Sequence, residues 1–172
     1  MKQFILGGAR SGKSRLAEKI CIDLGDKVAY IATANSAFND AEMAARISQH
    51  QEQRPPHWHT IEAPTALAKT LVSLQDYDAV LIDCLTLWLS NCLHQGNWPQ
   101  QRQDFLQALE NFTGELIIVS NEVGMGIVPL GELSRRFVDE SGFLHQAVAK
   151  RCERVIFTAA GLPLILKGSH LA

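Results

Sequence analysis

The chain is predicted to fold as a single α/β domain with a mainly parallel sheet flanked by helices. Short apolar runs alternate with amphipathic helical patterns along its 172 residues, which is typical of this class. Several of the runs are continuously apolar, as expected of strands that are buried on both faces. Because 172 residues suit one compact core and are too few for two, we expect one domain over residues 1–172.

The expected elements follow from these patterns. Apolar runs predict strands at Lys2 to Leu6, Lys27 to Thr33, Trp58 to Ile61, Ala79 to Asp83, Leu116 to Ser120, Arg154 to Ala159 and Leu164 to Lys167. Periodic apolar positions predict helices at Lys13 to Leu24, Asp40 to Gln53, Thr65 to Leu74, Leu85 to Leu93, Gln100 to Phe112 and Gly131 to Arg151. In the last helix, Leu133, Phe137, Leu144 and Val148 form one stripe, which favours packing against a core.

Composition excludes several classes of protein. Charged residues make up 20% of the chain and the formal net charge is -2, so there is no basic field of the kind that nucleic-acid binding requires. No apolar stretch is long enough for a membrane span, and the short apolar run after Met1 lacks the features of a signal peptide. We therefore expect a cytoplasmic protein without a nucleic-acid partner.

Cysteines and histidines give little support for a structural metal. The four cysteines are scattered without a Cys-x-x-Cys pair, and we expect them to be reduced and mostly buried; they are Cys21, Cys84, Cys92 and Cys152. His50, His57 and His59 lie close together in the sequence, but no cysteine pair or His-Glu-x-x-His helix accompanies them. The spacing therefore does not favour a zinc site.

A phosphate-binding motif lies between the first predicted strand and the first predicted helix. It reads Gly7-Gly8-Ala9-Arg10-Ser11-Gly12-Lys13-Ser14 and fits the P-loop pattern Gly-x-x-x-x-Gly-Lys-Ser. The glycines allow backbone N–H groups to converge on phosphate oxygens, and the helix N-terminus adds positive potential. Lys13 is expected to reach the outer phosphates, and Ser14 to offer a hydroxyl to Mg²⁺. The motif predicts a P-loop NTPase-like (RecA-like) domain that binds a nucleoside triphosphate with magnesium.

Two acidic residues follow apolar strands and could face the same crevice. Asp83 ends the run Ala79 to Asp83, where P-loop proteins place a carboxylate beside magnesium, although such an Asp can also cap the next helix. Glu122 follows the run Leu116 to Ser120 and could act as a base or bind a magnesium water, or be a plain loop residue.

Further segments make the sequence similar to one enzyme family. They are Tyr30-Ile31-Ala32-Thr33, Glu42-Met43-Ala44-Ala45-Arg46-Ile47 with His50, Arg54-Pro55 with Trp58, Asp83-Cys84-Leu85-Thr86, Asn121 to Pro129, Arg136-Phe137 and Ala160-Gly161-Leu162-Pro163 with Lys167. Together with the P-loop, they resemble the bifunctional adenosylcobinamide kinase and adenosylcobinamide-phosphate guanylyltransferase. The resemblance implies phosphorylation of adenosylcobinamide with ATP or GTP, followed by transfer of GMP from GTP to the new phosphate through a guanylylated histidine. On the motif Arg-Ile-x-x-His, that histidine is His50.

The residues agree with this chemistry but leave alternatives open. A neutral imidazole can attack the α-phosphorus of GTP, although exposed helix histidines are common and His57 and His59 compete with His50. The resemblance implies that the guanine nucleotide is lined by Ala32, Thr33, Ala34, Gln51, Glu52, Gln53, Arg54 and Glu62. The Glu62 carboxylate could accept hydrogen bonds from guanine N1–H and its 2-amino group, or could be a solvated charge.

Other functions and the oligomeric state stay open at this level. A P-loop small-molecule kinase without nucleotidyl transfer is the nearest alternative, and a nucleotide-dependent regulatory module is a further one. The resemblance implies a homotrimer. The apolar loop Gly124 to Pro129 suits a lid, a surface against another subunit, or core packing. His145 departs from the family, whose members often carry Asn there.

Overall fold

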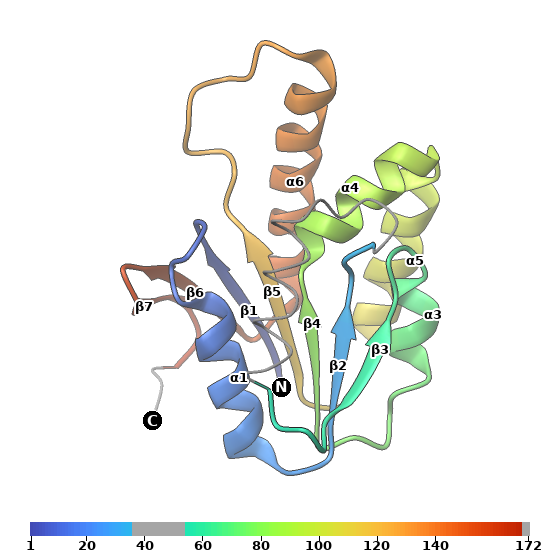
Figure 1. Ribbon diagram of the computed structural model, residues 1–172, viewed down its shortest axis with the longest axis vertical. Coiled ribbons are helices and arrows are strands. Elements are labelled where there is room, and N and C mark those ends of the chain that lie inside the picture. The colour runs from blue at the N-terminus through green and yellow to red at the C-terminus, as the bar shows by residue number, and fades with distance from the viewer. Residues whose placement is uncertain (36–53, 170–172) are drawn as a thin grey trace.

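The computed structural model describes residues 1–35 and 54–169 and is built on a seven-stranded sheet of order β3-β2-β4-β5-β1-β6-β7 (Figure 1). The strands are β1 (Lys2–Gly7), β2 (Val28–Ala32), β3 (His59–Glu62), β4 (Ala79–Asp83), β5 (Leu116–Asn121), β6 (Arg154–Ala159) and β7 (Leu162–Lys167). Neighbouring strands are parallel except for β7, which pairs antiparallel with β6. The predicted α/β class with a mainly parallel sheet is confirmed.

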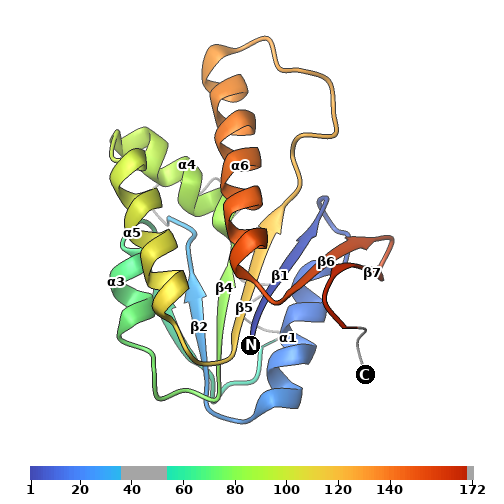
Figure 2. The same ribbon diagram turned by 180° about the vertical axis from the view of Figure 1, so that it is seen from behind.

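Helices cover both faces of the sheet (Figures 1 and 2). They are α1 (Lys13–Leu24), α3 (Leu67–Val72), α4 (Leu85–Gln95), α5 (Trp98–Asn111) and α6 (Glu132–Arg151). Phe4 packs in the core under α3 to α6, whereas its neighbour Ile5 packs in the core under α1. This division follows from the strand geometry, because successive side chains point to opposite faces. A three-layer domain results, with one core on each side of the sheet.

Several element boundaries differ from the predictions. Helix α5 begins at Trp98, two residues earlier than expected, because Pro99 is accepted in a first helical turn. Strand β3 ends at Glu62, one residue later than expected. Strand β7 begins at Leu162, because Ala160 and Gly161 reverse the chain at once with φ angles of 52° and 79°. The predicted helix Asp40 to Gln53 lies outside the described residues.

All four cysteines are buried free thiols, as predicted. Among the helices in residues 1–35 and 54–169, none is sufficiently long and apolar to cross a bilayer.

Candidate active site at the carboxyl edge of the sheet

The turn between β1 and α1 has the backbone geometry of a compact phosphate loop. Arg10 and Gly12 adopt left-handed conformations, with φ angles of 55° and 94°. Gly7 has no space for a side chain, since a Cβ there would lie 2.3 Å from Thr158 Oγ1. Helix α1 begins directly at Lys13, so its first backbone N–H groups, which lack partners within the helix, lie at this turn. The predicted P-loop is thus present as a strand–turn–helix unit able to bind an anion.

Lys13 folds back over this loop. Its side chain is buried, and Nζ donates a hydrogen bond of 2.9 Å to the carbonyl oxygen of Gly8. Burial lowers the pKa of Lys13, while the negative charge of Asp83 acts in the opposite direction. The Lys13 amine therefore lies at the loop and is close enough to interact electrostatically with Asp83, the carboxylate that was predicted from the sequence to share this site.

Three predicted site residues form a row across neighbouring strands. Asp83 on β4 is paired with Ala32 on β2, and Ala32 is paired with Glu62 on β3. The row lies at the carboxyl ends of the strands, which is where open α/β sheets bind ligands. Strand order thus brings together residues that lie up to 51 positions apart in the sequence.

A buried tyrosine orients the Asp83 carboxylate. Tyr30 is 4% exposed, and its hydroxyl donates a hydrogen bond of 3.1 Å to Asp83 Oδ2. The Arg54 guanidinium carbon lies 3.6 Å from the centre of the Tyr30 ring, a cation–π contact. From the sequence, Tyr30 was predicted only as part of the segment Tyr30-Ile31-Ala32-Thr33, without a role of its own. A tyrosine within an otherwise buried strand was the available signal, because a buried hydroxyl usually requires a partner.

Thr33 joins the end of β2 to the residue after β4. Its hydroxyl donates to the carbonyl oxygen of Cys84 at 2.7 Å and accepts from the Cys84 N–H at 2.9 Å. Asn91 Nδ2 donates to the Thr33 carbonyl oxygen at 2.9 Å. The Thr33 side chain therefore supports the protein backbone at the site. Ala34, which follows it, is half-buried.

Glu122 lies directly beside the phosphate loop. Its backbone N–H donates to the carbonyl oxygen of Gly7 at 3.0 Å, and its Oε1 accepts from the Gly124 N–H at 2.5 Å. The residue before it, Asn121, donates from Nδ2 to Thr86 Oγ1 at 2.9 Å. The structure therefore places Glu122 at the crevice, with one carboxylate oxygen engaged by its own loop.

His145 on α6 is a buried histidine that contacts the carboxyl end of β5. Its Nε2 lies 2.8 Å from Ser120 Oγ, and its ring centre lies 5.6 Å from that of Phe4. Burial lowers the pKa of His145 to about 4, although the charge of Glu122 acts to raise it. The imidazole is therefore neutral at physiological pH and supports the strand end that leads to Glu122.

The remaining predicted residues divide into two groups. Ser14 lies in the first turn of α1, next to Lys13. His50, Gln51, Glu52 and Gln53 lie outside the described residues. The predicted nucleophile and part of the predicted guanine site thus stay predictions.

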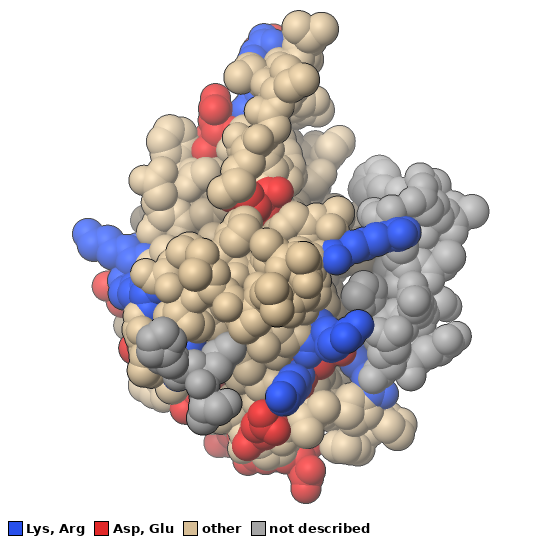
Figure 3. Space-filling view, turned by 90° about the vertical axis from the view of Figure 1, so that its left-hand side faces the viewer, with Lys and Arg blue, Asp and Glu red and all other residues tan. Residues whose placement is uncertain are grey.

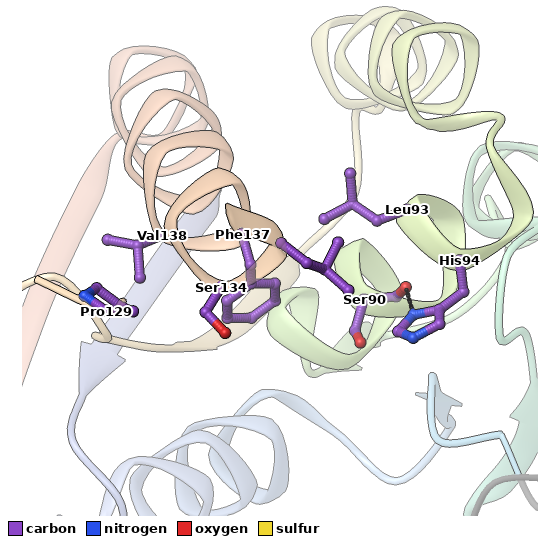
Figure 4. A pocket seen from close by; sticks show the side chains of 8 residues that line it. Ser90, Leu93, His94, Pro129, Ser134, Phe137 and Val138 are labelled. Atoms are coloured by element: carbon purple, nitrogen blue, oxygen red, sulfur yellow. Dashed lines mark hydrogen bonds between the residues drawn. The ribbon is translucent and has the colours of Figure 1, made fainter. Parts of the chain in front are cut away.

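An apolar hollow of about 270 Å³ lies between α4 and α6, close to this edge (Figure 4). It is lined by Ser90, Leu93, His94, Pro129, Leu133, Ser134, Phe137 and Val138. None of the lining residues belongs to the phosphate loop, so the hollow is distinct from it. Nearby, the segment between β5 and α6 projects from the body with highly exposed apolar side chains (top of Figure 3); they include Met125, Ile127, Val128 and Leu130.

A phosphate loop at the end of β1, with a carboxylate at the end of β4, defines a P-loop NTPase-type domain. Two solved structures have a similar fold. The flagellar accessory protein FlaH of Methanocaldococcus jannaschii is 15% identical with a TM-score of 0.54, covering 98% of this chain and 81% of FlaH. The RadB recombinase is 15% identical with a TM-score of 0.51, covering 90% of this chain and 72% of RadB. At this level of identity the likeness concerns the fold alone.

Sequence relatives identify the family. Residues 3–166 match the family described as cobinamide kinase / cobinamide phosphate guanyltransferase. The bifunctional adenosylcobalamin biosynthesis protein CobP of Pseudomonas aeruginosa is 55% identical, covering 99% of this chain and all of that protein. The bifunctional adenosylcobalamin biosynthesis protein CobU of Escherichia coli is 35% identical, covering 97% of this chain and all of that protein. The chain belongs to this family of bifunctional enzymes, and the family and enzyme class predicted from the sequence are confirmed.

Proposed function

We propose that the chain phosphorylates the aminopropanol hydroxyl of adenosylcobinamide and then transfers GMP from GTP to the new phosphate through a guanylylated His50. The product is adenosylcobinamide-GDP, an intermediate of cobalamin biosynthesis. One observation carries the proposal: Lys13 lies over a P-loop at the carboxyl edge of the sheet, within electrostatic reach of Asp83. This arrangement can hold a triphosphate so that nucleophiles reach its phosphorus atoms.

The chain offers suitable groups for the triphosphate and for magnesium. Backbone N–H groups at the start of α1 bind phosphate oxygens, and Lys13 exchanges its bond to the Gly8 carbonyl for one to an outer phosphate. Ser14 and Asp83 would hold Mg²⁺, because a hydroxyl and a carboxylate are the hard oxygen ligands that this ion prefers. Bound Mg²⁺ would neutralise charge on the phosphates. Tyr30 holds Asp83 Oδ2, which orients the carboxylate.

In the kinase step, the substrate hydroxyl attacks the γ-phosphorus of ATP or GTP. The new O–P bond forms as the bond between the γ-phosphorus and the bridging oxygen breaks, and the nucleoside diphosphate leaves. Glu122, beside the loop, accepts the hydroxyl proton after its Oε1 releases the Gly124 N–H.

In the nucleotidyl step, a neutral His50 nitrogen attacks the α-phosphorus of GTP. A P–N bond forms, the α–β phosphoanhydride bond breaks, and pyrophosphate leaves. A phosphate oxygen of adenosylcobinamide phosphate then attacks the same phosphorus, and the P–N bond breaks to regenerate the histidine. Glu62 is the last residue of β3, and Arg54 donates a hydrogen bond to Thr60 Oγ1 of the same strand. The guanine nucleotide is proposed to bind here, together with Ala32, Thr33 and Ala34.

Mass spectrometry tests the covalent step without a corrinoid. Incubation with GTP and Mg²⁺ should add one GMP to the protein, and His50→Ala should abolish the adduct. His57→Ala is the matched control, since His57 is an exposed histidine in the same part of the sequence and should leave the adduct intact. An adduct that persists in His50→Ala would exclude His50, and kinase turnover without any adduct would support the simpler P-loop kinase.

We also propose that the projecting loop is covered by other copies of the chain in a homotrimer. Ile127 and Leu130 are each 97% exposed, an unusual state for large apolar side chains unless they meet another surface. Light scattering should give three times the mass of the chain, and Ile127→Asp should lower it. A monomeric mass for the unaltered protein would contradict this arrangement.

A further inference from the structure

The phosphate loop is tied to the C-terminal hairpin by a chain of buried hydroxyl groups. Ser11 Oγ lies 2.8 Å from Thr158 Oγ1, and both residues are buried. Thr158 Oγ1 in turn donates to the carbonyl oxygen of Leu6 at 3.2 Å. A hydroxyl has only one proton, so Thr158 accepts from Ser11 while it donates to Leu6. The bonds therefore run in one direction, from the loop through β6 to β1.

A second contact joins the backbone of the loop to the turn between β6 and β7. The Gly161 N–H donates to the Ser11 carbonyl oxygen at 2.9 Å. A Cβ on Gly12 would lie 3.1 Å from Gly161 Cα, so the two backbones are in close contact. Ser11 is thus held through both its side chain and its carbonyl oxygen by residues about 150 positions away.

We propose that Thr158 and the β6–β7 turn position the phosphate loop for nucleotide binding. Arg10 in the loop has a φ of 55°, a left-handed conformation that a residue other than glycine rarely adopts, so ordering the loop in a free chain is costly. Thr158 and Gly161 hold this conformation before the nucleotide arrives, so less binding free energy is spent on ordering the loop. Thr158 is a positioning residue, because it acts through Ser11 and has no predicted contact with the phosphates. This inference rests on the proposed use of the P-loop.

The effect should appear in nucleotide affinity and should be the same for ATP and GTP. The loop binds phosphates, which the two nucleotides share, so a poorly held loop weakens both equally. The turnover number at saturating nucleotide should change little, because the bound nucleotide restores the loop. A residue that only stabilised the fold would lower the melting temperature without this separation of KM from kcat.

Titration of the complete protein with ATP and with GTP tests the inference through three variants. Thr158→Val removes the hydroxyl at nearly constant shape and should weaken both nucleotides about tenfold, the effect of losing one buried hydrogen bond. Thr158→Ser retains a hydroxyl and should stay within about twofold of the unaltered protein. Thr70→Val is the control, since it removes a half-buried threonine hydroxyl of α3 that bonds the Ala66 carbonyl oxygen, away from the loop.

The outcomes separate this inference from the proposed function. Unchanged affinity in Thr158→Val, or equal weakening in Thr158→Ser, would overturn the positioning role alone. Failure of the unaltered protein to bind either nucleotide would overturn the P-loop assignment itself. Should Thr158→Val not fold, hydrogen exchange on the unaltered protein provides the test: GTP should slow exchange of the Gly161 amide, and an unchanged rate would overturn the inference.

Discussion

Burial of His145 should make the stability of the fold depend on pH below neutrality. The residue is 7% exposed, and its Nε2 is held by Ser120 Oγ at 2.8 Å. Burial lowers its pKa from 6.5 to about 4, with Glu122 opposing the shift. In the folded protein the imidazole therefore stays neutral down to about pH 4, whereas in the unfolded chain it becomes protonated below pH 6.5.

The sign and size of the effect follow from this difference. Between pH 6.5 and pH 4 the unfolded chain binds more protons, so the free energy of unfolding falls as the pH falls. Each pKa unit corresponds to about 1.4 kcal/mol, so this residue alone should cost about 2 kcal/mol of stability at pH 5 and about 3 kcal/mol at pH 4. Well above pH 6.5, where the histidine is neutral in both states, its contribution is constant.

Urea denaturation between neutral pH and about pH 5 would measure the effect. His145→Asn is the informative variant, because Asn does not titrate and can still bond to Ser120. The stability of the unaltered protein relative to His145→Asn should fall by about 2 kcal/mol over this range. His57→Asn is the matched control, since it makes the same replacement at an exposed histidine. Parallel curves for His145→Asn would refute the argument that the buried imidazole is held neutral.

Three further predictions concern the site. Lys13→Ala should weaken GTP binding about a hundredfold in a titration, because charged hydrogen bonds to phosphate are lost, whereas the exposed Lys19→Ala should not. Glu62→Gln should reduce the preference for GTP over ATP in competition experiments, because the Gln side chain has one acceptor oxygen and cannot accept from both guanine donors as a carboxylate does. An unaltered preference would mean that Glu62 is a solvated charge at the end of β3. Tyr30→Phe keeps the ring beneath Arg54 but removes the hydrogen bond to Asp83. Direct titration of the nucleotide complex with Mg²⁺ should therefore show about tenfold weaker binding of the ion. Equal binding of Mg²⁺ would exclude the positioning of Asp83 by Tyr30.

Features encoded within a few neighbouring residues could be predicted from the sequence. The phosphate loop was predictable because residues 7–14 form a contiguous motif between an apolar strand and a helix. The α/β class was predictable for the same reason, since the side-chain periods of strands and helices are local. The predicted ends of strands and helices were less accurate, as at the start of β7. The chain reverses at Ala160 and Gly161 through two left-handed residues, and the position of a glycine does not by itself predict that an alanine before it is also left-handed.

Assembly of the site depended on long-range contacts. The sequence placed Asp83 and Glu62 at strand ends, but only the strand order put both beside Ala32. The bond from Tyr30 to Asp83 depends on the same pairing of β2 with β4. A buried His145 was visible only as a departure from the family, because its environment is made by Ser120 and Phe4 from distant strands.

By itself, then, the sequence specified a P-loop motif, its class of domain and its family, since each is recorded in short segments of residues. Tertiary structure alone decided which side chains support that loop. Ser11 and Thr158 are separated by 147 positions and meet because β1 and β6 are neighbours in the sheet. Such a contact depends on strand order and register, which arise from the packing of the whole domain and from no local pattern.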